Sequence, residues 1–350
     1  MRIGLIGYGA WGRYHARTIA AAAGAQLAAI ATRTEASAAA ARGDWPHARV
    51  TTSWLDLIRD PEIDVIDIVL PNNMHAEVGC AALEAGKDVL MEKPLATTRE
   101  ECDRLVHASR TSGRVLSIGH EFRLSTQWGR AKRLVDGGAI GEPLWVNVNL
   151  FRNPYRSGAD GWRHDPARVG SWILEEAVHF FDFAMWYLER YGDPVSVRTY
   201  GQARQVRPRG MVDICSSVLA FRGGAYATIN QCVAGFEHHL VLEIAGTDGA
   251  IRTSWSGAMD RDHNPVFDFR VQPKGFPFER GVREAEHHQI AASGEVYELA
   301  HQLKLTIEGL RQRRPLVSAE DSRKRVLCCI AAEQSLAEGR EVALDFSMAA

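Results

Sequence analysis

A glycine-rich turn near the start of the chain constrains the fold more than any other feature. The apolar run Arg2–Ile6 leads directly into Gly7-Tyr8-Gly9-Ala10-Trp11-Gly12, and a helix-like stretch follows. In dinucleotide-binding turns the first glycine permits a tight turn, the second lets the backbone approach a pyrophosphate, and the third lets helix pack on strand. The helix that begins at Ala10 would then face the phosphates with its partial positive charge. The turn therefore predicts a nucleotide-binding domain.

The first third of the chain alternates short apolar runs with helix-like stretches rich in Ala, Leu, Glu and Arg. Short apolar strands separated by helices indicate a parallel sheet that is covered on both faces and joined by right-handed crossovers. We therefore predict an α/β fold that begins with a Rossmann-type doubly wound domain over residues 1–120. The expected strands are Arg2–Ile6, Gln26–Ala31, Val65–Leu70, Asp88–Met91 and Arg114–Ile118, and the clearest helices are His75–Ala85 and Arg99–Ser112.

The pattern changes after about Gly119, where strand-like segments with alternating polar and apolar residues become predominant. Alternation of this kind predicts a large, mostly antiparallel sheet with one covered and one open face. Together with helices it makes a predicted α+β domain over residues 121–350. The segment Asp260–Gly294 has weak periodicity and is expected to be a long loop. The expected strands are Pro143–Phe151, Pro194–Ala203, Ile214–Phe221, Ala225–Ala234, Leu240–Ala245 and Ala250–Ser254, and the expected helices are Thr126–Asp136, Ser171–Arg190 and Ser318–Ala337.

The bulk composition is that of an ordinary soluble globular protein, with 46% hydrophobic and 24% charged residues. A net charge of -2 gives no electrostatic reason to expect a nucleic-acid partner. No apolar run reaches the ~18 residues that span a bilayer, and the N-terminus leads into a strand rather than a signal peptide. The six cysteines form no Cys-x-x-Cys pair, so reduced thiols and a cytoplasmic location are expected. The histidine doublets lack zinc-like spacing, and no metal site is predicted.

The end of the second strand bears on the form of the cofactor. NAD-binding domains usually place an acidic residue there to bind the ribose hydroxyls. Here the chain reads Ala31-Thr32-Arg33-Thr34, so a hydroxyl and a guanidinium replace the carboxylate. Both groups suit a 2′-phosphate, which a guanidinium binds with a planar fork. The sequence thus favours NADP(H) over NAD(H), although Glu35 follows closely and keeps NAD(H) open.

Two further segments follow strands at the same edge of the predicted sheet, where ligands bind in such folds. Pro71-Asn72 comes after the third strand, and Asn72 has two interpretations: a cap for the following helix or a residue of the site. Glu92-Lys93-Pro94 comes after the fourth strand. Lys93 is either a surface charge or a functional cation whose direction Pro94 fixes.

The predicted helix Ser171–Arg190 is apolar on nearly every side, which is typical of a buried helix. Glu175, His179 and Asp182 nevertheless share one face, at positions i, i+4 and i+7. Buried ionisable groups need partners or a water-lined cleft. The three residues are therefore either a satisfied network in the core or an acid–base group facing a cleft, in which Glu175 would orient and tune His179.

Taken in order, these motifs resemble the Gfo/Idh/MocA family, the group of glucose–fructose oxidoreductase and inositol dehydrogenase. The resemblance covers nearly all 350 residues. It implies a Rossmann domain joined to a larger mixed sheet whose open face commonly forms a dimer or tetramer interface. It rests on Gly7–Gly12, Pro71-Asn72-x-x-His75, Ala85-Gly86-Lys87 before Glu92-Lys93-Pro94, Gly119-x-x-x-Arg123, the helix with Glu175, His179 and Asp182, and the turn Gly246-Thr247-Asp248-Gly249.

The resemblance also implies roles for single residues. His179 would act as the general base, and Lys93 would polarise or hydrogen-bond the reacting oxygen. Glu175 stands where the family often has Asp, which leaves its role open between substrate and His179. Arg152, Trp162 and Arg163 precede the helix and would line a sugar pocket, with domain packing as the alternative for Trp162. The cofactor would contact Trp11, Pro71, Asn72, His75, Glu92, Lys93 and Arg123 in addition to the glycine turn, Thr32 and Arg33.

The leading hypothesis is an NAD(P)-dependent dehydrogenase or reductase that acts on a sugar, an inositol or a related polyol and forms a homodimer or homotetramer. A hydride would pass between the nicotinamide and a carbinol carbon. One alternative is a glycoside hydrolase that uses tightly held NAD for a transient oxidation, with similar residues. Another is a non-catalytic dinucleotide-binding regulator, against which the presence of both Lys93 and His179 argues.

Overall fold

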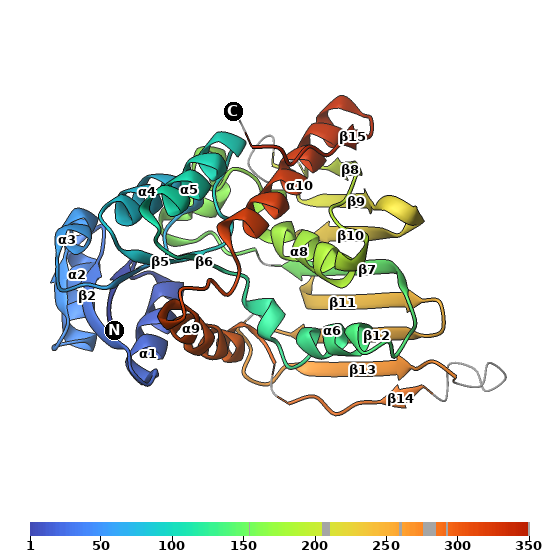
Figure 1. Ribbon diagram of the computed structural model, residues 1–350, viewed down its shortest axis with the longest axis horizontal. Helices are drawn as coiled ribbons and strands as arrows, with labels where there is room; N and C mark the ends of the chain where they lie inside the picture. The colour runs from blue at the N-terminus through green and yellow to red at the C-terminus, as the bar shows by residue number, and fades with distance from the viewer. Residues whose placement is uncertain (154, 205–210, 259–260, 276–284, 292, 349–350) are drawn as a thin grey trace.

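The computed structural model describes residues 1–153, 155–204, 211–258, 261–275, 285–291 and 293–348, which form two sheets with helices between them (Figure 1). The first sheet has six strands in the order β3-β2-β1-β4-β5-β6, and every neighbouring pair is parallel. This is the strand order of the dinucleotide-binding fold, so the predicted Rossmann sheet is confirmed. Its strands are β1 Arg2–Ile6, β2 Gln26–Ala31, β3 Arg49–Thr51, β4 Val65–Ile68, β5 Asp88–Glu92 and β6 Leu116–Gly119.

Local signals explain where the helices of this first unit begin and end. Thr34 and Thr98 cap α2 and α5, because their hydroxyls accept from the backbone N–H of Ser37 and Glu101. Gly113 ends α5 in the left-handed conformation. The helices are α1 Ala10–Ala21, α2 Glu35–Asp44, α3 Trp54–Arg59, α4 His75–Glu84 and α5 Arg99–Ser112.

A helix late in the chain completes the cover of the first sheet. This helix, α9 (Glu295–Arg311), packs beside α1 in Figure 1, and its apolar face joins the core formed by Ile3 and Leu5 of β1. The sequence analysis did not predict it, although its apolar spacing is helical. The buried apolar positions are Leu299, Leu303, Ile307 and Leu310.

The second sheet has nine strands in the order β14-β13-β12-β11-β7-β10-β9-β8-β15. Only β7 and β10 pair in parallel, so the predicted mixed, mostly antiparallel sheet is confirmed. The strands are β7 Pro143–Asn153, β8 Ser196–Gln202, β9 Ile214–Ala220, β10 Tyr226–Cys232, β11 Glu237–Gly246, β12 Ala250–Gly257, β13 Val266–Gln272, β14 Glu286–His287 and β15 Val342–Ala343.

The prediction of a long loop over Asp260–Gly294 was wrong in part. β13 and β14 lie within it, and β13 pairs along its length with β12. Phe269 and Val271 alternate with less buried residues, as in a half-covered strand. Residues 260, 276–284 and 292 of this segment lie outside the described residues.

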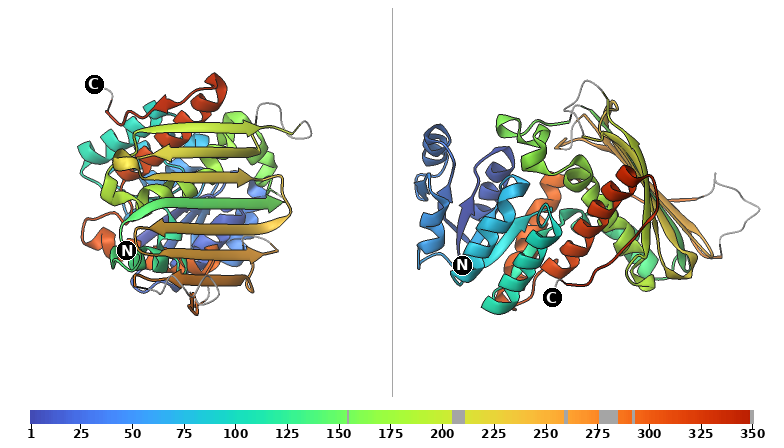
Figure 2. Two further views of the ribbon diagram at one scale, coloured as in Figure 1. Left: turned by 90° about the vertical axis from the view of Figure 1, so that its right-hand side faces the viewer. Right: turned by 90° about the horizontal axis from the view of Figure 1, so that it is seen from above.

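Helices cover one face of the second sheet, and Figure 2 shows its other face uncovered. The covering helices are α6 (Trp128–Asp136), α8 (Val178–Tyr187) and α10 (Ala319–Glu338). Large side chains remain exposed on the strands, including Tyr200 at 62%, Tyr226 at 43% and Val218 at 39%. Within the described residues, no helix has the length and apolar character needed to cross a membrane.

The predicted helix Ser171–Arg190 begins with a wider turn than expected. Ile173–Ala177 forms a π-helical turn, α8 follows, and Glu189–Tyr191 is 3-10 helical. Nine of the ten residues of α8 are buried, which confirms the prediction of a buried helix. Inserted π turns often occur at functional sites, and this one contains Glu175.

Candidate active site

The three glycines of the turn have different neighbours. A Cβ on Gly7 would lie 2.0 Å from the carbonyl oxygen of Val69, and one on Gly12 would lie 2.0 Å from that of Gly7. Any side chain at position 7 or 12 would therefore clash with the backbone, so both positions require glycine. A Cβ on Gly9, by contrast, would meet nothing within 4 Å. Gly9 is the N-cap of α1, and no side chain caps this helix. Open space beside uncapped backbone N–H groups fits a bound phosphate.

At the end of β2, Thr32 is buried and its hydroxyl donates to the carbonyl oxygen of Thr34 at 3.0 Å. Arg33 is instead exposed and forms an ion pair with Asp160 of the short helix η3 (Ala159–His164). Of the two residues predicted to bind a 2′-phosphate, only Arg33 therefore has an exposed side chain. Its guanidinium is paired with an acidic residue from the second half of the chain.

The segment Glu92-Lys93-Pro94 contacts the helical segment that contains Glu175 and His179. Lys93 Nζ, just beyond β5, donates to the backbone carbonyl of Glu175 at 2.7 Å and lies 3.7 Å from its Oε1. The Lys93 side chain is only 12% exposed. Residues 82 positions apart in the sequence thus place a cation against the π-helical turn that precedes His179.

Glu175 is held by partners on three sides. Its Oε1 accepts from Arg163 Nε at 2.9 Å, and its Oε2 accepts from Asn72 Nδ2 at 3.0 Å. Burial alone would raise the pKa of this carboxyl, but Lys93 and Arg163 hold the pKa below its ordinary value. Glu175 is therefore ionised.

Asn72 makes no capping hydrogen bond, and its amide instead reaches Glu175. Besides Glu175, its Nδ2 donates to the carbonyl oxygen of Val169 at 2.9 Å. The interpretation of Asn72 as a helix cap was wrong, because the amide is used to join the first sheet to the segment before the π-helical turn.

His179 lies in an aromatic and cationic setting. It is 6% exposed, and its ring stacks on Phe122 with the ring centroids 4.5 Å apart. The ring of His120 packs edge-on at 6.4 Å. Burial, followed by the charge of Lys93, holds the pKa of His179 well below its ordinary value. The imidazole is therefore neutral near pH 7 and able to accept a proton.

Asp182, the third member of the predicted face, belongs to a separate cluster. Its carboxylate accepts from Arg123 Nε at 2.8 Å and from Arg325 Nε at 2.9 Å. Burial opposes the charge, but Arg123 and then His120 lower the pKa of Asp182 far below its usual value. Asp182 thus forms a core network with Arg123 and Arg325. The role of Glu175 and His179 as an acid–base group facing a cleft stays a prediction.

Two expected contacts are replaced by others. Glu175 has Asn72, Arg163 and Lys93 as its hydrogen-bond and ion-pair partners among the described residues, rather than His179. Arg123, grouped with the cofactor residues, is engaged by Asp182, and its predicted contact with a cofactor stays a prediction. The π-helical turn offsets Glu175 from the regular α-helical spacing, so it and His179 take different partners.

The predicted pocket residues lie close to Glu175. Arg163 places its guanidinium 4.4 Å over the ring of Trp162, which is buried. Arg152 pairs with Glu176 at 2.7 Å and lies over the ring of Tyr155 at 5.2 Å. Neither Glu176 nor Tyr155 was singled out in the sequence. Glu176 adjoins Glu175 in a buried helix, and a second carboxylate there was a signal that a basic partner must be near.

His75 is one of the residues predicted to contact the cofactor. His75 is buried and its two ring nitrogens lie 2.7 Å from the carbonyl oxygen of Pro94 and 3.0 Å from that of Leu70. It thereby joins the turn that contains Pro71 to the turn that contains Lys93. Asn72 follows directly and reaches Glu175.

Glu92 belongs to a buried cluster that the sequence analysis missed. His15 of α1 lies 2.8 Å from Asp67 Oδ2 through Nδ1 and 3.1 Å from Glu92 Oε1 through Nε2. Burial opposes the charge, but Asp67 and then Glu92 raise the pKa of His15 to about 10. The signal was Asp67 itself, because a carboxylate inside a buried apolar strand needs a partner.

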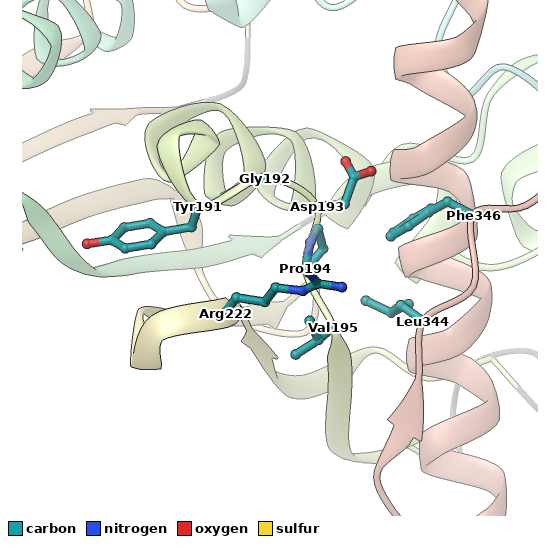
Figure 3. A pocket seen from close by; sticks show the side chains of 8 residues that line it. All are labelled: Tyr191, Gly192, Asp193, Pro194, Val195, Arg222, Leu344 and Phe346. Carbon is teal, nitrogen blue, oxygen red and sulfur yellow. The ribbon is translucent and has the colours of Figure 1, made fainter.

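A pocket of about 540 Å³ lies elsewhere, beside the edge of the second sheet (Figure 3). Leu344 and Phe346 of the C-terminal tail line it together with Val195 and Arg222. Because it contains none of the predicted site residues, it is not the candidate active site. Among the described residues no cluster of three His, Cys, Asp or Glu side chains fits a metal ion.

Two family models match the chain. Residues 1–120 match the model described as "Oxidoreductase family, NAD-binding Rossmann fold", and residues 128–252 match the "GFO/IDH/MocA C-terminal domain". The matched segments contain the glycine turn, Lys93, Glu175 and His179.

The relatives include dehydrogenases named for an inositol and for levoglucosan. Inositol 2-dehydrogenase 2 of Saccharopolyspora erythraea is 33% identical over 255 residues, which cover 72% of each chain. Levoglucosan dehydrogenase of Pseudarthrobacter phenanthrenivorans is 30% identical over 289 residues, covering 72% of this chain and 73% of the relative. A structure of levoglucosan dehydrogenase with NADH and levoglucosan aligns with a TM-score of 0.79 and 26% identity, covering 98% of this chain and 99% of that one.

Proposed function

Because the chain belongs to the GFO/IDH/MocA oxidoreductase family, we propose that it transfers a hydride between a nicotinamide cofactor and a carbinol or carbonyl carbon of a sugar, an inositol or a related polyol. The observation that carries the proposal is the meeting of Lys93, from the edge of the first sheet, with the helical segment of Glu175 and His179. The open space at Gly9 and the uncapped start of α1 fit the cofactor. The nicotinamide ring, when bound, accepts or supplies the hydride.

In the oxidative direction, neutral His179 takes the proton of the reacting hydroxyl. Lys93 donates to the same oxygen and stabilises the negative charge that develops on it, which is the kind of preorganised electrostatic stabilisation that enzymes use. Lys93 needs no large movement for this role, because the carbonyl of Glu175 already holds its Nζ in place. In the reductive direction the two residues return the proton and stabilise the same alkoxide.

Glu175 acts on Lys93 in this proposal. Its carboxylate is 3.7 Å from Lys93 Nζ and is fixed by Asn72 and Arg163. It would keep Lys93 charged and in position, while Arg163, Trp162 and Arg152 shape the pocket for the sugar. This assigns Glu175 a different task from the orientation of His179.

The proposal is tested by a screen of sugars, sugar acids, anhydrosugars and inositols with NAD and NADP, followed by absorbance at 340 nm. The best substrate is then used with K93A and H179A. Both variants should lose at least about 100-fold in kcat. Exposed Lys304 and His107 supply the matched controls K304A and H107A, which should retain wild-type turnover. Near-wild-type turnover in K93A and H179A would remove both residues from the chemistry. Release of a leaving group without net change at 340 nm would instead favour the glycoside hydrolase.

For the cofactor we propose NADP(H) over NAD(H), with Arg33 binding the 2′-phosphate in place of Asp160. The carboxylate of Asp160 forms an ion pair with the guanidinium and would repel a phosphate. D160N should therefore raise the ratio of kcat/KM for NADP over NAD by about threefold to tenfold, and R33Q should lower it by a similar factor. An R33Q enzyme with an unchanged ratio would show that Arg33 does not select the cofactor.

We further propose that the open face of the second sheet joins subunits into a homodimer or homotetramer. Val218 and Tyr226 are exposed there. Asn230 lies beside them on β10 and donates to Asn149 at 2.7 Å, so part of the face is an ordered ladder of amides. V218E should lower the mass measured by light scattering.

All six cysteines are free, which supports a cytoplasmic location.

A further inference from the structure

The guanidinium of Arg261 lies against the glycine turn, although Arg261 is far from this turn in the sequence. It follows β12 in the chain and so comes from the second sheet. Its guanidinium carbon lies 4.5 Å from the centroid of the Trp11 ring and 5.3 Å from that of the Tyr14 ring. Trp11 is the second residue of α1, next to Ala10 and two positions after Gly9. A positive charge from the second half of the chain is therefore held beside the start of α1.

The surroundings of Arg261 leave part of its hydrogen-bonding capacity unused. Its side chain is 15% exposed, and its nearest described anion is Glu295, with Nε and Oε2 3.6 Å apart. This separation permits an ion pair but exceeds a hydrogen bond. The buried Nε has no hydrogen-bond partner among the described residues. A buried guanidinium donor without a partner is costly unless a ligand satisfies it.

The local charge also favours an anion. Burial lowers the pKa of Arg261, and the charge of Arg163 lowers it further, whereas Glu295 acts in the opposite direction. Glu295 is shared, since Arg156 also lies 3.7 Å from its Oε2. At α1 the first turn contains no acidic residue, and the N-cap is a glycine with open space beside it. The guanidinium with the free donor therefore stacks on Trp11, two positions after Gly9, where the helix is uncapped and the space is open.

We propose that Arg261 binds the pyrophosphate of the dinucleotide cofactor and closes the second half of the chain over the glycine turn. A guanidinium suits this role, because its planar fork binds two phosphate oxygens at once. Stacking on Trp11 fixes the plane of the fork, and Glu295 holds it from the other side. The inference rests on the proposed function and adds to it a cofactor ligand from outside the Rossmann sheet.

The test measures binding of nicotinamide-free cofactor fragments by calorimetry. ADP-ribose contains the full pyrophosphate, whereas AMP contains only the phosphate on the adenosine side. Their 2′-phosphorylated forms are measured in parallel, so that the choice between NAD and NADP does not affect the comparison. The variants are R261M, which keeps the apolar stem over Trp11, and R261K, which keeps the charge without the fork. R270M, on strand β13, serves as the matched control.

R261M should weaken ADP-ribose binding about tenfold or more and AMP binding less than twofold, and R261K should fall between R261M and wild type. R270M should bind like wild type. Thermal melting without ligand verifies that each variant is folded. If R261M does not fold, R261K is used for the comparison with wild type. ADP-ribose binding within twofold of wild type in R261M would overturn the proposal. An unchanged ADP-ribose affinity with a raised KM for the sugar would overturn it too, and would assign Arg261 to the substrate. A wild-type protein that binds no dinucleotide would instead overturn the proposed function itself.

Discussion

Two buried histidines in this molecule have opposite protonation states, although both are removed from water. His15 is 0% exposed and His179 is 6% exposed. His15 lies between the carboxylates of Asp67 and Glu92, and its pKa is raised to about 10. His179 has Phe122 and His120 as ring neighbours, and its pKa is lowered by burial and then by the charge of Lys93. Burial alone does not decide the charge; the partners do.

The difference matches two tasks. Charged His15 joins α1 to β4 and β5. The helix α1 begins in the glycine turn, β4 leads to Asn72, and β5 leads to Lys93. The pKa of His179 is lowered by burial and by the charge of Lys93, so the neutral ring can take a proton. Under the proposed function, the first region would support the site through stability, and the second would contribute to it through chemistry.

The largest expected effect separates the two histidines by activity. H179N should lower kcat by about 10²- to 10⁴-fold, because the proposed general base is lost, while the urea midpoint changes little. H15N should have much the smaller direct effect on kcat of the folded enzyme. Steady-state assays and urea unfolding on both variants give the comparison. A fully active H179N would contradict the assignment of the two regions.

The free energy of unfolding should be affected more by H15N than by H179N. H15N removes the cation between two buried carboxylates, which should lower the free energy of unfolding by about 3–5 kcal/mol. Urea unfolding monitored by circular dichroism measures it, with the exposed H107N as the control. A loss below about 1 kcal/mol would show that the cluster of His15, Asp67 and Glu92 is not what joins α1 to the sheet.

The pH dependence of stability should follow from His15. Its folded-state pKa, about 10, lies above the value of an unfolded histidine, about 6.5. The stabilisation is therefore fully present below about pH 6.5 and is lost as pH rises through about 10. The difference in unfolding free energy between wild type and H15N should narrow over this range. A difference that is constant from pH 6 to pH 10 would show that His15 is not the charged partner.

The pH dependence of activity should follow from His179 with the opposite sign. Because its pKa is lowered, the residue stays neutral as pH falls through the ordinary histidine value. The acid limb of kcat/KM for alcohol oxidation should thus lie below about pH 6.5. An acid limb near or above 7 would indicate a charged His179 or a different base.

The smallest expected effect concerns Asn72. N72A removes one hydrogen bond to Glu175 and should lower kcat by roughly fivefold to tenfold, which corresponds to about 1 kcal/mol. The thermal midpoint should change by only a few degrees. N230A, which removes an amide from the open face of the second sheet, is the control and should leave kcat unchanged. Equal effects in both variants would argue against a link from Asn72 through Glu175 to Lys93.

Features that depend on nearby residues could be predicted from the sequence. The glycine turn, the first two strands and the helix Arg99–Ser112 follow from apolar spacing, caps and glycines, and the structure has them at the predicted bounds. Lys93 could be placed at the ligand-binding edge because the carboxyl ends of parallel strands define where a ligand lies. The position of His179 opposite it was implied only by the family resemblance.

Features that depend on distant partners could not be predicted from the sequence. Asp182 shares a helical face with His179, but its partners Arg123 and Arg325 are 59 and 143 residues away. His15 and Glu92 are 77 residues apart. The π-helical turn at Ile173–Ala177 also leaves no mark in the apolar spacing, yet it decides which groups Glu175 meets.

The central claim is that Lys93 and His179 act together on one substrate oxygen, and a double-mutant cycle tests it most directly. The value of kcat/KM is measured for wild type, K93A, H179A and the double variant with the best substrate of the screen. Residues that act as one unit should give a double variant about as slow as the slower single variant. If the two losses instead multiply, or if either single variant keeps wild-type activity, the two residues do not share one active site.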